Sequence, residues 1–69
     1  MIEENDLVIT NKRINELIEI STKGVILSIY NNGDAFLIEF INANGETIGN
    51  GMETVQKSDI ELLVKSKRG

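Results

Sequence analysis

The clearest alternation of apolar and polar positions lies in the middle of the chain, over Ala35–Ile41. Alternate side chains of a strand point to opposite faces, so Phe36, Ile38 and Phe40 fall on one face and the residues between them on the other. We predict that these three large apolar side chains belong to a hydrophobic core. The segment is therefore predicted to be a strand with one buried face.

A second β-rich run, Gly24–Tyr30, precedes this strand and is rich in β-branched residues. Its alternation is imperfect, which predicts a bulge near Leu27 or Ser28. The pair Asn32-Gly33 separates the two runs, and both residues tolerate the positive φ of a type I′ turn. We therefore predict an antiparallel hairpin.

Further β elements are predicted on either side of this hairpin, together with one helical turn. Two glycines interrupt the later strand pattern and predict a bulge or a sharp bend. The expected elements are a strand at Asp6–Thr10, a strand from Glu46 toward Gln56, a helical turn at Lys57–Asp59 and a closing strand at Ile60–Val64. The fold class is thus all-β, with five strands and one short helical turn.

The segment Asn11–Thr22 is ambiguous. Ile14, Leu17 and Ile18 have the i, i+3, i+4 spacing of a helical face, and Asn11 or Asn15 could cap a helix. Because the run is short, we favour a long loop with at most one helical turn, and its conformation stays open.

Length and composition indicate one domain over residues 1–69, with a frayed polar tail at 65–69. The chain has 69 residues, no cysteine and a net charge of −4. No stretch approaches the about 20 apolar residues of a membrane helix, and the acidic N-terminus has no apolar signal-peptide region. We therefore expect a cytoplasmic protein that does not associate with membranes. The negative charge argues against general nucleic-acid binding and favours a basic partner.

The residue types present exclude several kinds of catalytic site. Without histidine or cysteine, the chain cannot form a Ser-His-Asp or Cys-His device, and it lacks the usual zinc ligands. Asn42–Glu46 contains oxygen ligands beside a glycine, but a type I′ turn at Asn44-Gly45 explains that segment without a metal. Glu39, Glu46 and Glu53 could pair as acid and base, yet solvated strand charges account for them. We expect no enzyme activity, no metal and no cofactor.

Four blocks follow one another along the chain: Asp6–Thr10, Gly24–Tyr30, Ala35–Phe40 and Asn44–Thr47. In order and spacing they resemble a bacterial family, the domain of unknown function 4926. The similarity extends over about Asp6 to Leu62 and rests on turn glycines and strand residues. The chain departs from the family in its first loop, with Ile14 where the family has Pro and Ser21-Thr22 where it has Gly-Asp.

This resemblance implies a small five-stranded SH3-like barrel that stands alone. Members of the family tend to be encoded beside presumed toxin genes. The resemblance therefore implies an immunity protein that binds and neutralises an antibacterial toxin, of the kind used in contact-dependent inhibition. A nucleic-acid or ribosome-associated module and a general interaction adaptor are the alternatives.

The predicted binding residues follow from charge and exposure. A nuclease-type toxin presents basic residues around its phosphate site, and an acidic domain can cover that site. The sequence leaves open the toxin, the binding face and the oligomeric state. The predicted partner-binding residues are Glu16, Glu19, Tyr30, Asp34, Glu46 and Glu53.

Overall fold

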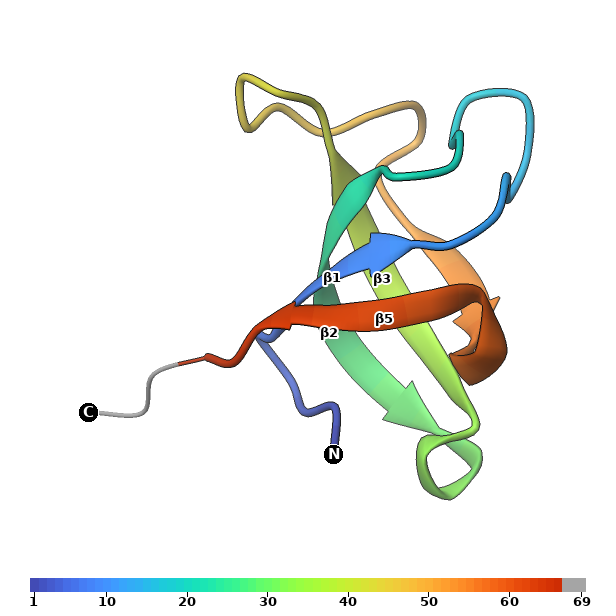
Figure 1. Cartoon of the computed structure of the whole chain (residues 1–69), viewed down its shortest axis with the longest axis vertical. Helices are drawn as coiled ribbons and strands as arrows, with labels where there is room; N and C mark the ends of the chain where they lie inside the picture. The colour runs from blue at the N-terminus through green and yellow to red at the C-terminus, as the bar shows by residue number, and fades with distance from the viewer. Residues whose placement is uncertain (67–69) are drawn as a thin grey trace.

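The computed structural model describes residues 1–66 and is mainly β, with five antiparallel strands in a single sheet (Figure 1). The strand order is β4-β3-β2-β1-β5, so the first strand lies between the second and the last. Within the described residues β4 and β5 are the two ends of this order, and the sheet does not close between them. The strands are β1 Leu7–Thr10, β2 Lys23–Tyr30, β3 Ala35–Ile41, β4 Glu53–Gln56 and β5 Ile60–Val64.

The sheet folds over a compact hydrophobic core. β1 and β5 run across β2 and β3 at a steep angle (Figure 1), so inward-facing residues from all five strands meet. The predicted core residues Phe36, Ile38 and Phe40 are buried, with at most 1% of their surface exposed. The remaining buried apolar residues are Val8, Ile18, Ile26, Val55 and Ile60.

The predicted central hairpin is confirmed. β2 pairs antiparallel with β3, and Tyr30 lies opposite Ala35 at its end. Asn32 (φ 58°) and Gly33 (φ 95°) both adopt positive φ, and the Asp34 N–H donates to the Asn31 carbonyl at 3.2 Å. These are the features of a type I′ turn. The turn forms part of a short 3₁₀ segment, η1, at Asn31–Gly33.

Two predicted irregularities are also present. The β2–β3 register shifts between Ile26 and Ser28, where a bulge was expected. After β3 the chain forms one bridge, Ile41 to Thr47, and then turns through residues 49–51 before β4 begins. The fourth strand is therefore shorter than the pattern from Glu46 suggested. The predicted helical turn is the 3₁₀ segment η2, Lys57–Asp59.

Close packing explains one glycine in β2. Gly24 pairs with Phe40, and a Cβ atom built on it would lie 2.5 Å from Ile38 Cγ2 and 2.9 Å from Phe40 Cδ1. No larger residue fits there without displacing two core side chains. In the described residues no helix is long and apolar enough to cross a membrane.

Candidate functional site

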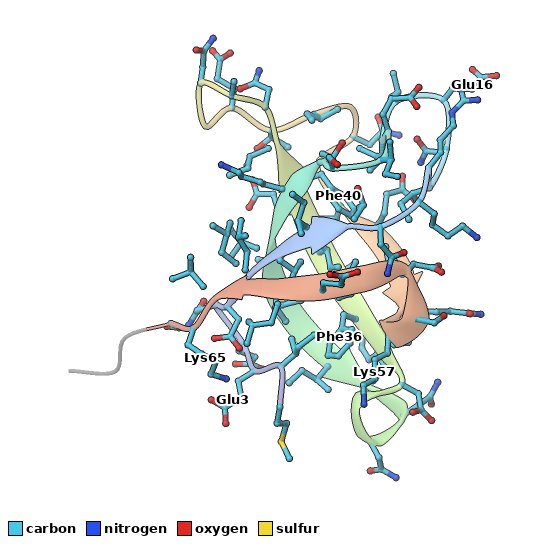
Figure 2. The ribbon with its side chains drawn as sticks, viewed as in Figure 1. Glu3, Glu16, Phe36, Phe40, Lys57 and Lys65 are labelled. Carbon is cyan, nitrogen blue, oxygen red and sulfur yellow. The ribbon has the colours of Figure 1, made fainter. Side chains whose placement is uncertain are left out.

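The structure separates the predicted partner-binding residues into different regions. Glu16 and Glu19 lie on the loop of residues 11–22, which shares one end of the sheet with the loop of residues 42–52 that carries Glu46 (Figures 1 and 2). Tyr30 and Asp34 flank the turn of the β2–β3 hairpin, at the opposite end (Figure 1). The sixth residue, Glu53, is half-buried at the start of β4, opposite Ile38. These residues do not form one surface.

The first loop has no helix, and one buried side chain anchors it. Ile18 is part of the core, whereas Leu17 is 62% exposed. The Asn15 side-chain oxygen accepts hydrogen bonds from the N–H groups of Leu17 (2.8 Å) and Ile18 (3.0 Å). Asn side chains commonly bond to nearby backbone in this way and so stabilise turns. The interpretation as a long loop is therefore confirmed.

A buried threonine fixes the end of this loop. The Thr10 hydroxyl donates to the Glu19 carbonyl (2.8 Å) and accepts from the Thr22 N–H (2.9 Å). The Ser21 N–H donates to the Thr10 carbonyl at 2.9 Å. The backbone entering β2 is thus held in place on the last residue of β1.

The loop after β3 is organised by Asn42. Its side-chain oxygen accepts from the N–H groups of Asn44 (2.9 Å) and Glu46 (3.0 Å), and its amide donates to the Glu46 carboxylate (3.2 Å). Gly45 has positive φ (83°), but Asn44 does not. The predicted type I′ turn at Asn44-Gly45 is therefore wrong. The Asn42 side chain holds a three-residue loop whose last residue is left-handed, a recognised alternative for hairpins.

Within residues 1–66, three of the five cationic side chains form ion pairs. Lys12 lies 3.9 Å from Asp59, Arg13 lies 3.4 Å from Glu19, and Lys65 contacts two carboxylates. Within residues 1–66, Lys23 and Lys57 have no carboxylate within 4.0 Å. The carboxylates without a cationic partner in the same range are Glu4, Glu16, Asp34, Glu39, Glu46, Glu53 and Glu61.

The face of the sheet away from the core is also largely apolar. Ile9 lies between Lys23 and Glu61 in register, and Leu7 lies between Val25 and Val64. We call this surface the outer face. Antiparallel sheets commonly present polar residues on the face away from the core, so an apolar outer face marks a candidate binding surface. Its residues are Leu7, Ile9, Lys23, Val25, Glu39, Ile41, Glu61 and Val64.

A cleft of about 490 Å³ opens on the outer face, between the end of the first loop and the loop after β3. Lys23 is the one charged residue in its lining. Its size and mixed lining resemble those of small-ligand sites, which typically occupy about 300–1,000 Å³. The lining residues are Leu7, Ser21, Thr22, Lys23, Ile41, Asn42, Ala43, Gly45 and Ile48.

The sequence did not indicate the most buried charge, Asp6. Its carboxylate accepts from the N–H groups of Glu3 (2.8 Å) and Ser66 (2.7 Å) and from the Lys65 ammonium (2.8 Å). The hydrogen bonds from Lys65 and Ser66 lower the pKa of Asp6 to about 2, and the bond to Asp6 raises the pKa of Lys65. Figure 2 shows Lys65 and Glu3 close together near the two chain ends.

This arrangement, the terminal clasp, is structural. The residues Glu3, Asp6, Lys65 and Ser66 hold the segment before β1 against the segment after β5. Lys65 and Ser66 belong to the segment predicted to be a frayed tail, and residues 67–69 of that tail lie outside the described residues.

No cluster of three or more potential metal-ligating His, Cys, Asp or Glu side chains occurs in residues 1–66. Comparisons with protein-family models, with curated proteins and with solved structures found no match for this chain.

Proposed function

We propose that this chain is a non-enzymatic protein-binding domain whose partner is a basic protein. The observation that carries the proposal is the imbalance of surface charge. Lys12, Arg13 and Lys65 are ion-paired with carboxylates, while carboxylates on both loops, on the hairpin and on the outer face have no cationic partner among residues 1–66. The surface field is therefore negative, and such a field attracts a cationic partner and accelerates its association.

The scatter of the predicted residues is compatible with this proposal. Electrostatic steering depends on the summed field of the molecule, so Glu16 at one end and Asp34 at the other both contribute before contact is made. Direct contact requires a continuous surface, and the outer face supplies one, with an apolar centre and the carboxylates Glu39 and Glu61 among its residues. Steering and contact thus depend on different residues.

We infer that the fold is a small, partly open SH3-like barrel. The steep crossing of β1 and β5 over β2 and β3 supports this inference, as does the 3₁₀ turn η2 between β4 and β5. Fold alone does not specify function, since barrels of this kind serve many roles. The proposal of binding rests on the charges and on the outer face.

We propose further that the basic partner is an antibacterial toxin, which this chain neutralises. The support is the resemblance to the 4926 family, whose members tend to be encoded beside presumed toxin genes, together with the negative surface. A general adaptor would share the fold but would not require a cationic partner.

The test is co-expression with a toxin-like gene found beside this one. Cells that make the toxin should grow only when this chain is present, and the purified proteins should form a one-to-one complex. Reversing Glu16, Asp34, Glu46 and Glu53 to Lys should slow association at least tenfold and reduce its dependence on salt. The isosteric Gln variants at the same four positions serve as the matched control and should give an intermediate effect.

Glu16, Asp34 and Glu46 are exposed, and surface charges contribute little to stability, so these positions should tolerate the change. Glu53 is half-buried, so its replacement by Lys carries the largest risk to the fold. Thermal unfolding of each variant checks this point. Full protection of cells by the Lys variant, with an unchanged association rate, would refute recognition by charge. Absence of any complex with the neighbouring product would refute the toxin proposal.

A further inference from the structure

The cleft on the outer face differs from the rest of the surface in the sign of its charge. Carboxylates dominate elsewhere, but the one charged side chain in this lining is Lys23. Its ammonium has no carboxylate within 4.0 Å among residues 1–66, although Glu39 and Glu61 lie on the same face. The Glu39 carboxylate instead accepts a hydrogen bond from the Thr47 hydroxyl. The positive charge in the cleft is therefore available to an anionic group.

The other polar side chains of the lining are largely occupied. The Asn42 amide and carbonyl bond within their own loop, and the Thr22 hydroxyl donates to the Glu19 carbonyl at 2.7 Å. Polar recognition of a ligand thus falls on the Lys23 ammonium and the Ser21 hydroxyl. Leu7, Ile41 and Ile48 supply an aliphatic surface beside them. The cleft therefore suits a group that is apolar on one side and anionic on the other.

The positions of the positively charged side chain and of the aliphatic surface limit the class of ligand that the cleft can bind. Lys23 is directly opposite Ile41 in the β2–β3 register, and side chains paired in this way begin about 5 Å apart. The last residue of a polypeptide carries its carboxylate and its side chain on one Cα, so neighbouring cationic and aliphatic side chains can contact both. A fatty acid, in contrast, places its apolar end far from its carboxylate.

We propose that this cleft binds the C-terminal residue of a polypeptide, with an aliphatic side chain on Leu7, Ile41 and Ile48 and the carboxylate on Lys23. Capture of a chain terminus by a fixed site is a known mode of peptide recognition. Hydrogen bonds of the Asn42 side chain fix one wall of the cleft, and hydrogen bonds of the Thr10 hydroxyl fix the other. The site is therefore formed without a ligand. A preformed site loses less conformational entropy on binding. The proposal does not depend on the toxin hypothesis.

The test is a titration of the whole ¹⁵N-labelled chain followed by NMR. The probe is N-acetyl-Gly-Gly-Leu with a free carboxylate, compared with its C-terminal amide, with N-acetyl-Gly-Gly-Ser and with octanoate. We expect saturable shifts at Ser21–Lys23 and Ala43–Gly45, and a dissociation constant for the acid at least tenfold below that of the amide. The serine peptide and octanoate should each bind at least tenfold more weakly than the leucine peptide.

Lys23→Met keeps the aliphatic stem and removes the charge, so it should abolish the preference for acid over amide. Lys57→Met is the matched control, because Lys57 also has no carboxylate within 4.0 Å in the described part of the chain but lines a different cleft, together with Asp34. This variant should keep the preference. Both side chains are exposed, and unchanged unfolding curves will show that the fold is intact.

Three results would overturn the proposal. Equal affinity for acid and amide would remove the role of Lys23. Tighter binding of octanoate than of the leucine peptide would assign the cleft to small acids. No saturable shift with any probe would show that the cleft is not a site for this chemistry.

Discussion

Replacing Gly24 with alanine sets two opposing effects against each other. In an open strand this change would stabilise the protein by about 0.5–1 kcal/mol, because glycine loses more backbone freedom on folding. Here the new Cβ would lie 2.5 Å from Ile38 Cγ2 and 2.9 Å from Phe40 Cδ1, against an optimal separation of about 3.5–4.0 Å. The Glu39 carbonyl oxygen lies 3.2 Å away on the same side. To remove these steric clashes, the buried side chains of Ile38 and Phe40 must move.

Overpacking of this kind costs about 1–3 kcal/mol, and two buried neighbours place Gly24→Ala in the upper part of that range. After subtraction of the backbone gain, we expect a net loss of about 1–2 kcal/mol in the free energy of unfolding. With a urea m-value of about 1 kcal/mol/M for so small a domain, the midpoint should fall by about 1–2 M. Equilibrium urea unfolding followed by circular dichroism measures this shift.

A double-mutant cycle with Ile38→Leu tests the stated cause. Leucine has no branch at Cβ, so it removes the methyl group that lies nearest to the new atom. We expect the pair Gly24→Ala and Ile38→Leu to show a favourable coupling of about 0.5 kcal/mol or more. Gly33→Ala is the matched control, because it costs about 1 kcal/mol through its φ of +95°, while no atom of a non-neighbouring residue in the described range 1–66 lies within 4 Å of the new Cβ.

Gly33→Ala should therefore be additive with Ile38→Leu. If Gly24→Ala leaves the urea midpoint unchanged or raises it, the close approach of β2 to the core side chains is not as described. Zero coupling with Ile38→Leu would refute the assignment of the clash to that residue.

Three further predictions concern the core, the terminal clasp and nucleic acid. Phe40→Ala should reduce the free energy of unfolding by about 3–5 kcal/mol, measured by urea unfolding, because a fully buried aromatic ring is removed; a loss below about 1 kcal/mol would contradict its place in the core. The pKa of Asp6 is lowered from 3.8 to about 2, so its ionised form contributes stability above about pH 4 that is lost as the pH falls toward 2. Asp6→Asn should therefore lower the melting temperature at pH 7, and the difference from wild type should shrink by pH 2; a constant difference would refute the linkage. With a net charge of −4, the chain should give no electrophoretic shift of RNA or DNA at micromolar protein and near-physiological salt, and a clear salt-sensitive shift would favour the nucleic-acid alternative.

The strands were predictable where the sequence alternates between apolar and polar residues. Ala35–Ile41 was placed with its observed bounds, because the strict period of two leaves one possible buried face. The turn at Asn32-Gly33 and the bulge before Ser28 followed from local backbone preferences. Such features depend on neighbours in sequence, so the sequence suffices for them.

The outer face was not predictable, because β1 lacks a regular alternation of apolar and polar residues. Leu7, Val8 and Ile9 are consecutive apolar residues, so the pattern does not reveal that Val8 faces the core while its neighbours face outward. The burial of Asp6 was not predicted, because an aspartate among other acidic residues indicates a solvent-exposed segment. Its burial depends on Lys65 and Ser66, about 60 residues later in the chain.

The candidate site also depends on contacts between distant segments. The cleft combines residues 21–23 with residues 41–48, and only the fold places these two segments together. Glu16, Glu19 and Asp34 lie in the predicted loop and turn, whereas Glu46 lies in the loop before β4 and not on the predicted strand. The sequence carried no information on which loops share an end of the sheet. The dispersal of these carboxylates over both ends could not be foreseen.

The position of β1 between β2 and β5 has a consequence for folding kinetics. Thr10 pairs with Ile60, so the sheet gains its last strand only when segments about 50 residues apart meet. Closing such a loop is opposed by chain entropy before any contact is gained, and folds dominated by distant pairings fold in about milliseconds to seconds. The β2–β3 hairpin, by contrast, can form early from neighbouring residues. Until β5 joins the sheet, the backbone of β1 presents an open edge to other chains, so this interval is when the protein is most exposed to misassembly.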